Sequence, residues 1–202
     1  ILDIGCGPAV YTDQLANAGC YVYGVDISER MVRLATEKVS VNATFLTGTI
    51  YYLPFASEVF DGVLCVGVLE YLKDIDAGVR ELVRVIKPGG TLLVTAPNAL
   101  SVLNRFDAVL RNIVRFSSNC LGFNVLRKFM DYEYVSQAIT PRQLALLLAA
   151  HGLVIEKQCH HIFRLAWLNK LSPKLSLWIA QRMNFISNPW FSINTVVRAR
   201  RV

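Results

Sequence analysis

Short apolar segments alternate with amphipathic segments over the first 97 residues of the chain. The segments with a strand-like pattern are 1–4, 21–28, 43–49, 60–68 and 91–97. Segments with a helical pattern lie between most of them, at 11–19, 29–39 and 77–86. Strands joined through helices run parallel in one sheet, because the crossover brings the chain back to the same edge. The alternation therefore predicts a Rossmann-like, doubly wound α/β fold.

Helix-capping and helix-breaking residues support these boundaries. Ser28 stands where a helix N-cap is expected, and the turn at 87–90 should stop the third helix. Further along, Pro141 and Gly152 frame a helix whose N-cap is Thr140. Strand-like segments follow at 153–163 and 191–200. We therefore expect a mostly parallel sheet of seven strands whose last strand is antiparallel.

Two segments interrupt the alternation, at 98–139 and 164–190. The first contains an amphipathic helical pattern over 100–116, and both are rich in Phe, Leu, Trp and Arg, including Trp167, Trp178 and Trp190. Both follow strands at their carboxyl ends, where ligands of α/β sheets bind. We expect one domain over 1–202, with these segments as helical lids on the acceptor side. Helices that only pack on the sheet are the alternative.

Composition narrows the cellular setting. Hydrophobic residues make up 53% of the 202 residues and the mean hydropathy is +0.39, but no apolar run is long enough to span a bilayer. The net charge of +6 is compatible with a nucleic acid, an anionic membrane surface or an acidic substrate. The five cysteines form no disulfide or metal-ligand pattern. We expect a cytoplasmic protein with reduced thiols, no metal site and, as an alternative, peripheral membrane contact.

A glycine-rich turn follows the first predicted strand, in the stretch "ILDIGCGPAVYT". Glycines here let backbone N–H groups and a helix N-terminus approach a ligand closely. A dinucleotide site needs a third glycine three residues after Gly7, and that position is Val10. Asp26 lies about 20 residues past the glycines, where nucleotide-binding folds place an acid that binds ribose.

The turn resembles the first motif of class I methyltransferases that depend on S-adenosylmethionine (SAM), an acidic residue followed by G-x-G-x-G. Asp3, Gly5 and Gly7 match, and Ala9 replaces the third glycine. The stretches "LTGTIYYLPF", "FDGVLCVGVLEYL" and "ELVRVIKPGGTLLVTAPN" resemble the motifs that come next in this family. The resemblance covers 1–97, continues in "ITPRQLALLLAAHGLVIEK", and favours the type 11, ubiquinone-biosynthesis-like branch that acts on small molecules.

The resemblance implies SAM as cofactor and a set of binding positions. Asp26 would bind the ribose hydroxyls, Ile27 would pack beside the adenine, and Thr49 with the Ile50 backbone would meet the adenine amino group. The full set that we expect to bind the cofactor is Asp3, Gly5, Cys6, Gly7, Asp26, Ile27, Thr49, Ile50 and Val66. Family members carry helices before the first strand, so we expect an N-terminally truncated domain with a partly uncovered pocket.

The expected reaction is methyl transfer to an oxygen or carbon atom of a hydrophobic small molecule. A base for the acceptor could be Glu70, His160 or His161, and the residues leave this choice open, as they do the oligomeric state. A nucleic-acid methyltransferase is one alternative, although "CVGV" stands where base-amine methyltransferases carry Asn/Asp-Pro-Pro-Tyr. A SAM-binding protein without transfer activity is the other, because Ala9 and Thr49 depart from the family pattern.

Overall fold

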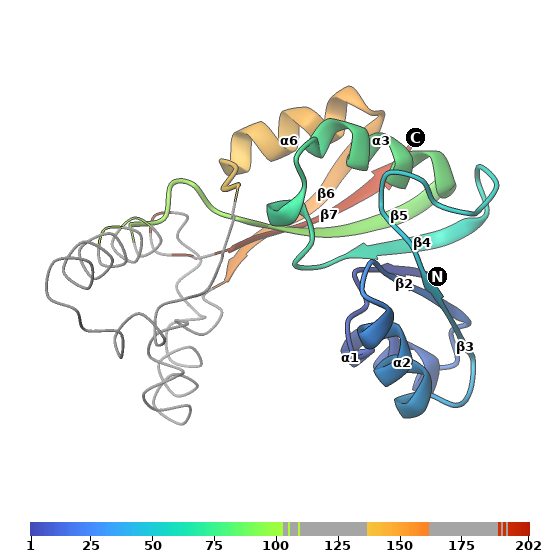
Figure 1. The fold of residues 1–202 in the computed structure, drawn as a ribbon. Coiled ribbons are helices and arrows are strands. Elements are labelled where there is room, and N and C mark those ends of the chain that lie inside the picture. Colours follow the sequence, from blue (N-terminus) through green and yellow to red (C-terminus); the bar gives the residue numbers. More distant parts are fainter. Residues whose placement is uncertain (103–104, 106–108, 110–136, 162–189, 191, 193) are drawn as a thin grey trace, which may run out of the picture. The chain divides into compact units, whose positions relative to one another are not determined.

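The structure is a computed structural model that describes residues 1–102, 105, 109, 137–161, 190, 192 and 194–202 (Figure 1). The chain divides into two compact units, which we describe separately. The first contains Ile1–Ala96, Arg142–Gln158 and Val196–Val202, and the second contains Pro97–Pro141 and Cys159–Thr195. Most of the expected helix over 100–116, and most of both predicted insertions with Trp167 and Trp178, lie outside the described residues.

The strands form one sheet of seven in the order β3-β2-β1-β4-β5-β7-β6. Their bounds are β1 Leu2–Ile4, β2 Val22–Asp26, β3 Ala43–Thr47, β4 Phe60–Cys65, β5 Ile86–Pro97, β6 Leu153–His161 and β7 Asn194–Arg201. The first five strands pair in parallel, with Asp3 opposite Gly24 on one side and Leu64 on the other. The order reverses at β1, which places the topological switch point beside the glycine turn.

Helices cover both faces of this sheet, which confirms the doubly wound prediction. In the first unit, α1 and α2 lie on one face and α3 and α6 on the other (Figure 1). Their bounds are α1 Val10–Asn17, α2 Glu29–Lys38, α3 Ile75–Val85 and α6 Pro141–Ala150, with a short 3-10 helix η1 at Leu69–Tyr71. The predicted cap is present, since the Ser28 hydroxyl accepts a hydrogen bond from Met31 N–H. Asp74 caps α3 through Ala77 N–H.

The last strand is antiparallel, as expected. Its partners in β6 are met in reverse order, because Thr195 contacts His160, Arg200 contacts Glu156, and Val202 N–H bonds to the Gly152 carbonyl. Residue numbers that rise along β7 thus fall along β6. Strand β7 lies between β5 and β6.

Strand β5 begins five residues earlier than the sequence pattern indicates. Lys87–Gly90 was expected to form a turn, but these residues continue the strand with an irregular register between Phe60 and Gly62 of β4. Gly90 fits there because a side chain would crowd the Asp61 carbonyl, only 3.1 Å from the Cβ position. Lys87 pairs with the Asp61 carboxylate at 2.7 Å. Gly89 and Gly90 therefore lie at a β-bulge inside the strand instead of in a turn before it.

The core of the first unit lies between β1, β4 and β5 and the inner faces of the helices. Leu2, Val63 and Leu92 of the sheet and Leu82 of α3 are fully buried. Each such side chain contributes about 1.5–3 kcal/mol of transfer free energy on burial. Among the described residues, no helix has both the length and the apolar character needed to cross a bilayer.

Candidate functional site

The turn between β1 and α1 has a left-handed backbone at three alternate residues. The φ angles are 67° at Gly5, 50° at Gly7 and 55° at Ala9. Ala9 occupies the position of the missing third glycine and keeps the glycine-like conformation. Its methyl group is fully buried in an apolar cluster with Ala16 and Ala35. Contacts in the core thus hold an alanine in a conformation that alanine seldom adopts.

The two glycines of the turn differ in their surroundings. A Cβ added at Gly5 would lie 2.3 Å from Val68 Cγ2, so the chain after β4 packs directly on the turn. A Cβ added at Gly7 would meet no atom within 4 Å. Gly5 is therefore required for packing, whereas Gly7 borders open space.

Asp26 at the end of β2 is joined to the glycine turn. Its Oδ2 atom accepts a hydrogen bond from Gly7 N–H at 2.9 Å, and its Oδ1 atom accepts one from Ser28 N–H at 2.8 Å. The Val25 carbonyl accepts from both Gly5 and Cys6 N–H, at 2.7 and 3.2 Å. Both carboxylate oxygens are thus fixed in direction, and each keeps a second lone pair for a ligand. Asp26 itself is half-buried.

Asp3 lies behind the turn. The side chain is 2% exposed, and its Oδ2 atom accepts a hydrogen bond of 2.6 Å from the hydroxyl of Thr12 on α1. Burial raises the pKa of Asp3 to about 6, against the opposing effect of the Thr12 hydrogen bond. Burial also raises the pKa of the Cys6 thiol to about 12, so this thiol stays protonated near neutral pH.

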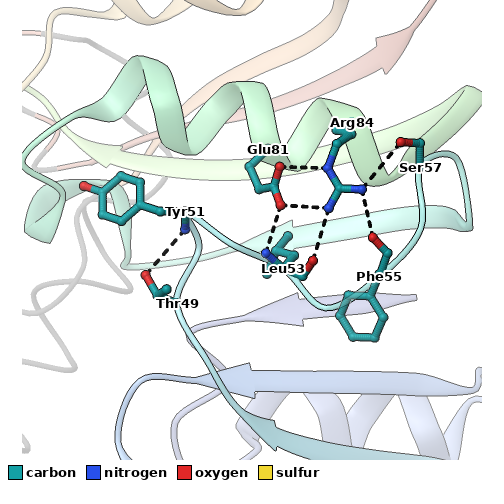
Figure 2. A network of polar contacts seen from close by, with 7 residues as sticks. All are labelled: Thr49, Tyr51, Leu53, Phe55, Ser57, Glu81 and Arg84. Atoms are coloured by element: carbon teal, nitrogen blue, oxygen red, sulfur yellow. Dashed lines mark hydrogen bonds and ion pairs between the residues drawn. The ribbon is translucent and has the colours of Figure 1, made fainter.

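The residues after β3 form the other side of the site. The Thr49 hydroxyl accepts a hydrogen bond from Tyr51 N–H at 3.4 Å (Figure 2). Tyr52 N–H bonds to the Thr49 carbonyl. The Ile50 side chain is buried close to Gly78 of α3. Ile27, after β2, is 78% exposed.

An ion pair on α3 holds this same segment (Figure 2). Arg84 bonds to Glu81 through Nε at 2.8 Å and Nη2 at 2.7 Å. The Arg84 guanidinium also donates to the carbonyls of Leu53 and Phe55, at 3.2 and 2.8 Å. The hydrogen bonds from Arg84 lower the pKa of Glu81, which keeps the pair ionised at neutral pH.

The candidate bases lie in different units. Glu70 is in η1 of the first unit and is 6% exposed, and Val66 directly follows β4. Gly67 N–H in the same stretch donates to the Thr95 hydroxyl at 2.9 Å. His160 belongs to the second unit, where Nδ1 is 3.3 Å from the Thr195 hydroxyl, and His161 ends β6. The role of a base stays a prediction for all three.

Three supporting residues were not expected from the sequence: Thr12, Val68 and Thr95. The role of Thr12 could have been predicted from the sequence, because it is a polar residue on the inner face of a short helix that follows a buried acid. The roles of Val68 and Thr95 could not have been predicted, since their contacts join segments that are distant in the sequence.

Comparison with known proteins decides the family. Residues 2–94 match the family model described as a methyltransferase domain. This part of the chain is therefore a methyltransferase domain, as its resemblance to class I SAM-dependent methyltransferases predicts. This match confirms the resemblance to the type 11 branch that the sequence motifs indicated. SAM is the cofactor of this family.

Relatives and a solved structure agree with this assignment. The chain is 32% identical over 157 residues to a ubiquinone biosynthesis O-methyltransferase of Coxiella burnetii, an alignment that covers 76% of this chain and 62% of the relative. It is 30% identical to a demethylmenaquinone methyltransferase of Corynebacterium urealyticum, over 75% of this chain and 66% of the relative.

The chain therefore spans about three fifths of the length of the curated relatives that it matches first. Magnesium protoporphyrin IX methyltransferase of Synechocystis, crystallised with S-adenosylhomocysteine (SAH), superposes on it with a TM-score of 0.65 at 20% identity. That superposition covers 100% of this chain and 73% of the other, and it supports the fold.

Proposed function

We propose that this methyltransferase transfers a methyl group from SAM to an oxygen or carbon atom of a hydrophobic small molecule. The observation that carries the proposal is the Asp26 carboxylate, which Gly7 and Ser28 fix beside the glycine turn at the switch point of the sheet. A carboxylate with both oxygens oriented can accept hydrogen bonds from the two neighbouring hydroxyls of a ribose.

The residues present fit an adenosine-bearing cofactor. Gly7 borders open space, Asp26 is half-buried with lone pairs to spare, and Ile27 offers an exposed apolar side chain. In our proposal the cofactor is held by the residues Gly5, Cys6, Gly7, Asp26, Ile27, Thr49, Ile50 and Val66. Asp3 would support the turn from behind, because its buried carboxylate is bonded to Thr12.

The bound cofactor supplies a methyl group attached to a positively charged sulfur. This sulfur is the leaving group and becomes a neutral thioether. The protein's part is to hold an acceptor atom in line with that methyl group and to exclude water. An acceptor hydroxyl must also lose its proton, and Glu70 is the candidate base in the unit that carries the glycine turn. His160 and His161 are the candidates in the second unit.

The names of the relatives guide the choice of acceptor. Ubiquinone biosynthesis and demethylmenaquinone methyltransferases both point to quinone-type rings with apolar tails. The aromatic and leucine-rich composition of 98–139 and 164–190 suits such an acceptor. We therefore propose a lipid-like phenol or quinone, and peripheral contact with an anionic membrane as the route by which it arrives.

Replacing Asp26 with alanine is expected to weaken SAH binding about tenfold to a hundredfold, the range for a hydrogen-bonding charged partner. The variant Asp26→Asn keeps one acceptor oxygen and should lose less affinity for SAH than Asp26→Ala does. Titration calorimetry with SAH measures both, and NADH serves as the ligand control. Glu29→Gln is the matched variant, because its side chain is 77% exposed at the start of α2.

Each result separates the alternatives. Equal affinities for Asp26→Ala and Glu29→Gln would contradict the placement of the ribose, and binding of NADH instead of SAH would contradict the cofactor. Turnover is then measured with radiolabelled SAM on prenylated phenols and, in parallel, on RNA and DNA. SAH binding with no transfer to any acceptor would favour a SAM-binding protein, and salt-sensitive transfer to RNA or DNA would favour a nucleic-acid methyltransferase.

A further inference from the structure

The segment between β3 and β4 carries two proposed adenine-side residues but contains no helix or regular strand. Residues 48–59 include Thr49 and Ile50, and their local order comes from an isolated bridge between Thr49 and Tyr52 and from the bond of Tyr51 N–H to the Thr49 hydroxyl. A ligand that binds to backbone groups here needs the segment to be held in one position before binding. Side chains of α3 hold it at Leu53, Phe55 and Ser57, and Gly48 N–H bonds to the Asp26 carbonyl.

Arg84, on the last turn of α3, binds three successive parts of this segment. Its guanidinium donates to the carbonyls of Leu53 and Phe55, and Nη1 lies 3.5 Å from the Ser57 hydroxyl (Figure 2). The planar fork of an arginine can reach several acceptors at once, which a lysine cannot do. One side chain thus fixes the segment over five residues.

Glu81 completes the attachment one turn earlier on the helix. Its Oε1 atom accepts from Leu53 N–H at 2.8 Å while it also binds Arg84 Nη2. Leu53 is therefore held at both its N–H and its carbonyl by a single ion pair. The Glu81 side chain is 17% exposed and the Arg84 side chain 33% exposed, so water competes only in part for their hydrogen bonds.

Helix α3 is itself a rigid base for these contacts. Its inner face is fully buried at Val79, Leu82 and Val85, and Asp74 caps its first turn. Asp74 N–H also donates to the Tyr51 hydroxyl at 3.2 Å, which adds a second point of attachment near Thr49. The position of the segment is thus set by the position of the helix.

We propose that Arg84 and Glu81 are positioning residues for the cofactor, holding the segment after β3 in the geometry that receives the adenine ring. The inference rests on the proposed function. Neither side chain is required to touch the cofactor, because the carbonyls of Leu53 and Phe55 relay the constraint along the backbone to Thr49 and Ile50.

Replacing Arg84 with methionine tests this role, because methionine keeps an apolar stem and removes the fork. We expect the Kd for SAH to rise about tenfold, and the Kd for 5′-methylthioadenosine, which lacks the amino-acid part, to rise by the same factor. Arg84→Lys should recover part of the loss. Hydrogen exchange at the Leu53 amide should become faster.

Arg80→Met is the matched control on the same helix, since Arg80 pairs only with Asp76 among the contacts of the described residues. Its affinity for both ligands should equal that of the wild type. Glu81→Gln gives a second, milder variant, expected to weaken both ligands about threefold, in case Arg84→Met does not fold.

The outcomes separate positioning from stability. A lower melting temperature with unchanged affinity in both Arg84→Met and Glu81→Gln would overturn the inference, as would a loss for SAH that 5′-methylthioadenosine does not share. Wild-type protein that binds neither ligand would overturn the proposed function and this inference with it. Wild-type binding with unaffected variants would overturn the positioning role alone.

Discussion

Replacing Gly5 with alanine should lower the free energy of unfolding by about 2–5 kcal/mol, the sum of left-handed backbone strain and forced overlap with the Val68 side chain. The φ angle of 67° disfavours any residue with a Cβ, and that Cβ would lie 2.3 Å from Val68 Cγ2. Either the turn or the chain after β4 must move. Urea unfolding followed by circular dichroism measures the loss.

Gly7→Ala separates the two causes. Its φ angle of 50° imposes similar strain, but open space surrounds the new methyl group, so we expect a loss of only about 1–2 kcal/mol. The double variant Gly5→Ala/Val68→Ala removes the overlapping methyl group and should recover part of the stability. Equal losses for Gly5→Ala and Gly7→Ala would show that Val68 does not press on the turn.

Asp3→Asn should become progressively more stable than the wild type as the pH rises from about 4 to 7. The folded-state pKa of Asp3 is about 6, above the unfolded value of 3.8, so the folded protein binds the proton more tightly. Wild-type stability from this group is therefore fully present below pH 3.8 and is lost as the pH rises through 6. A shift of about two units corresponds to about 3 kcal/mol.

Unfolding free energies of both proteins at several pH values measure this difference. Asparagine keeps an oxygen that can accept from the Thr12 hydroxyl, so the comparison isolates the charge. Glu29→Gln, at an exposed carboxylate, should show no comparable trend. A difference between Asp3→Asn and wild type that stays constant with pH would mean that Asp3 ionises as readily in the folded protein as in the unfolded chain.

The sequence was sufficient for the features that depend on local chemistry. Periodicity predicted the order of strands and helices, and Ser28 marked the start of α2. The sequence also predicts that Asp26 lies beside the glycine turn, because parallel strands end at the same edge of a sheet, and the bond from Gly7 N–H to Asp26 Oδ2 confirms this position. These inferences hold because neighbours in the sequence or adjacent strands create the feature.

Features that depend on distant contacts could not be predicted. The early start of β5 follows from its pairing of Ile86 with Phe60, which overrides the turn tendency of Lys87–Gly90. The role of Arg84 depends on carbonyls about thirty residues away, which any sequence supplies. The conformation of Ala9 is set by packing against α1 and α2 instead of by its own preference.

The position of β7 between β5 and the edge strand β6 has a consequence for the order of events during folding. Because β7 separates β5 from β6, the sheet cannot grow outward strand by strand in the order in which the chain is made. Arg201 bonds to the Ile86 carbonyl across 115 residues of chain, a closure that is slow because most of the intervening chain must first be ordered or looped out. We therefore expect β1–β5 to assemble first, and β6 with α6 to join only once β7 has arrived.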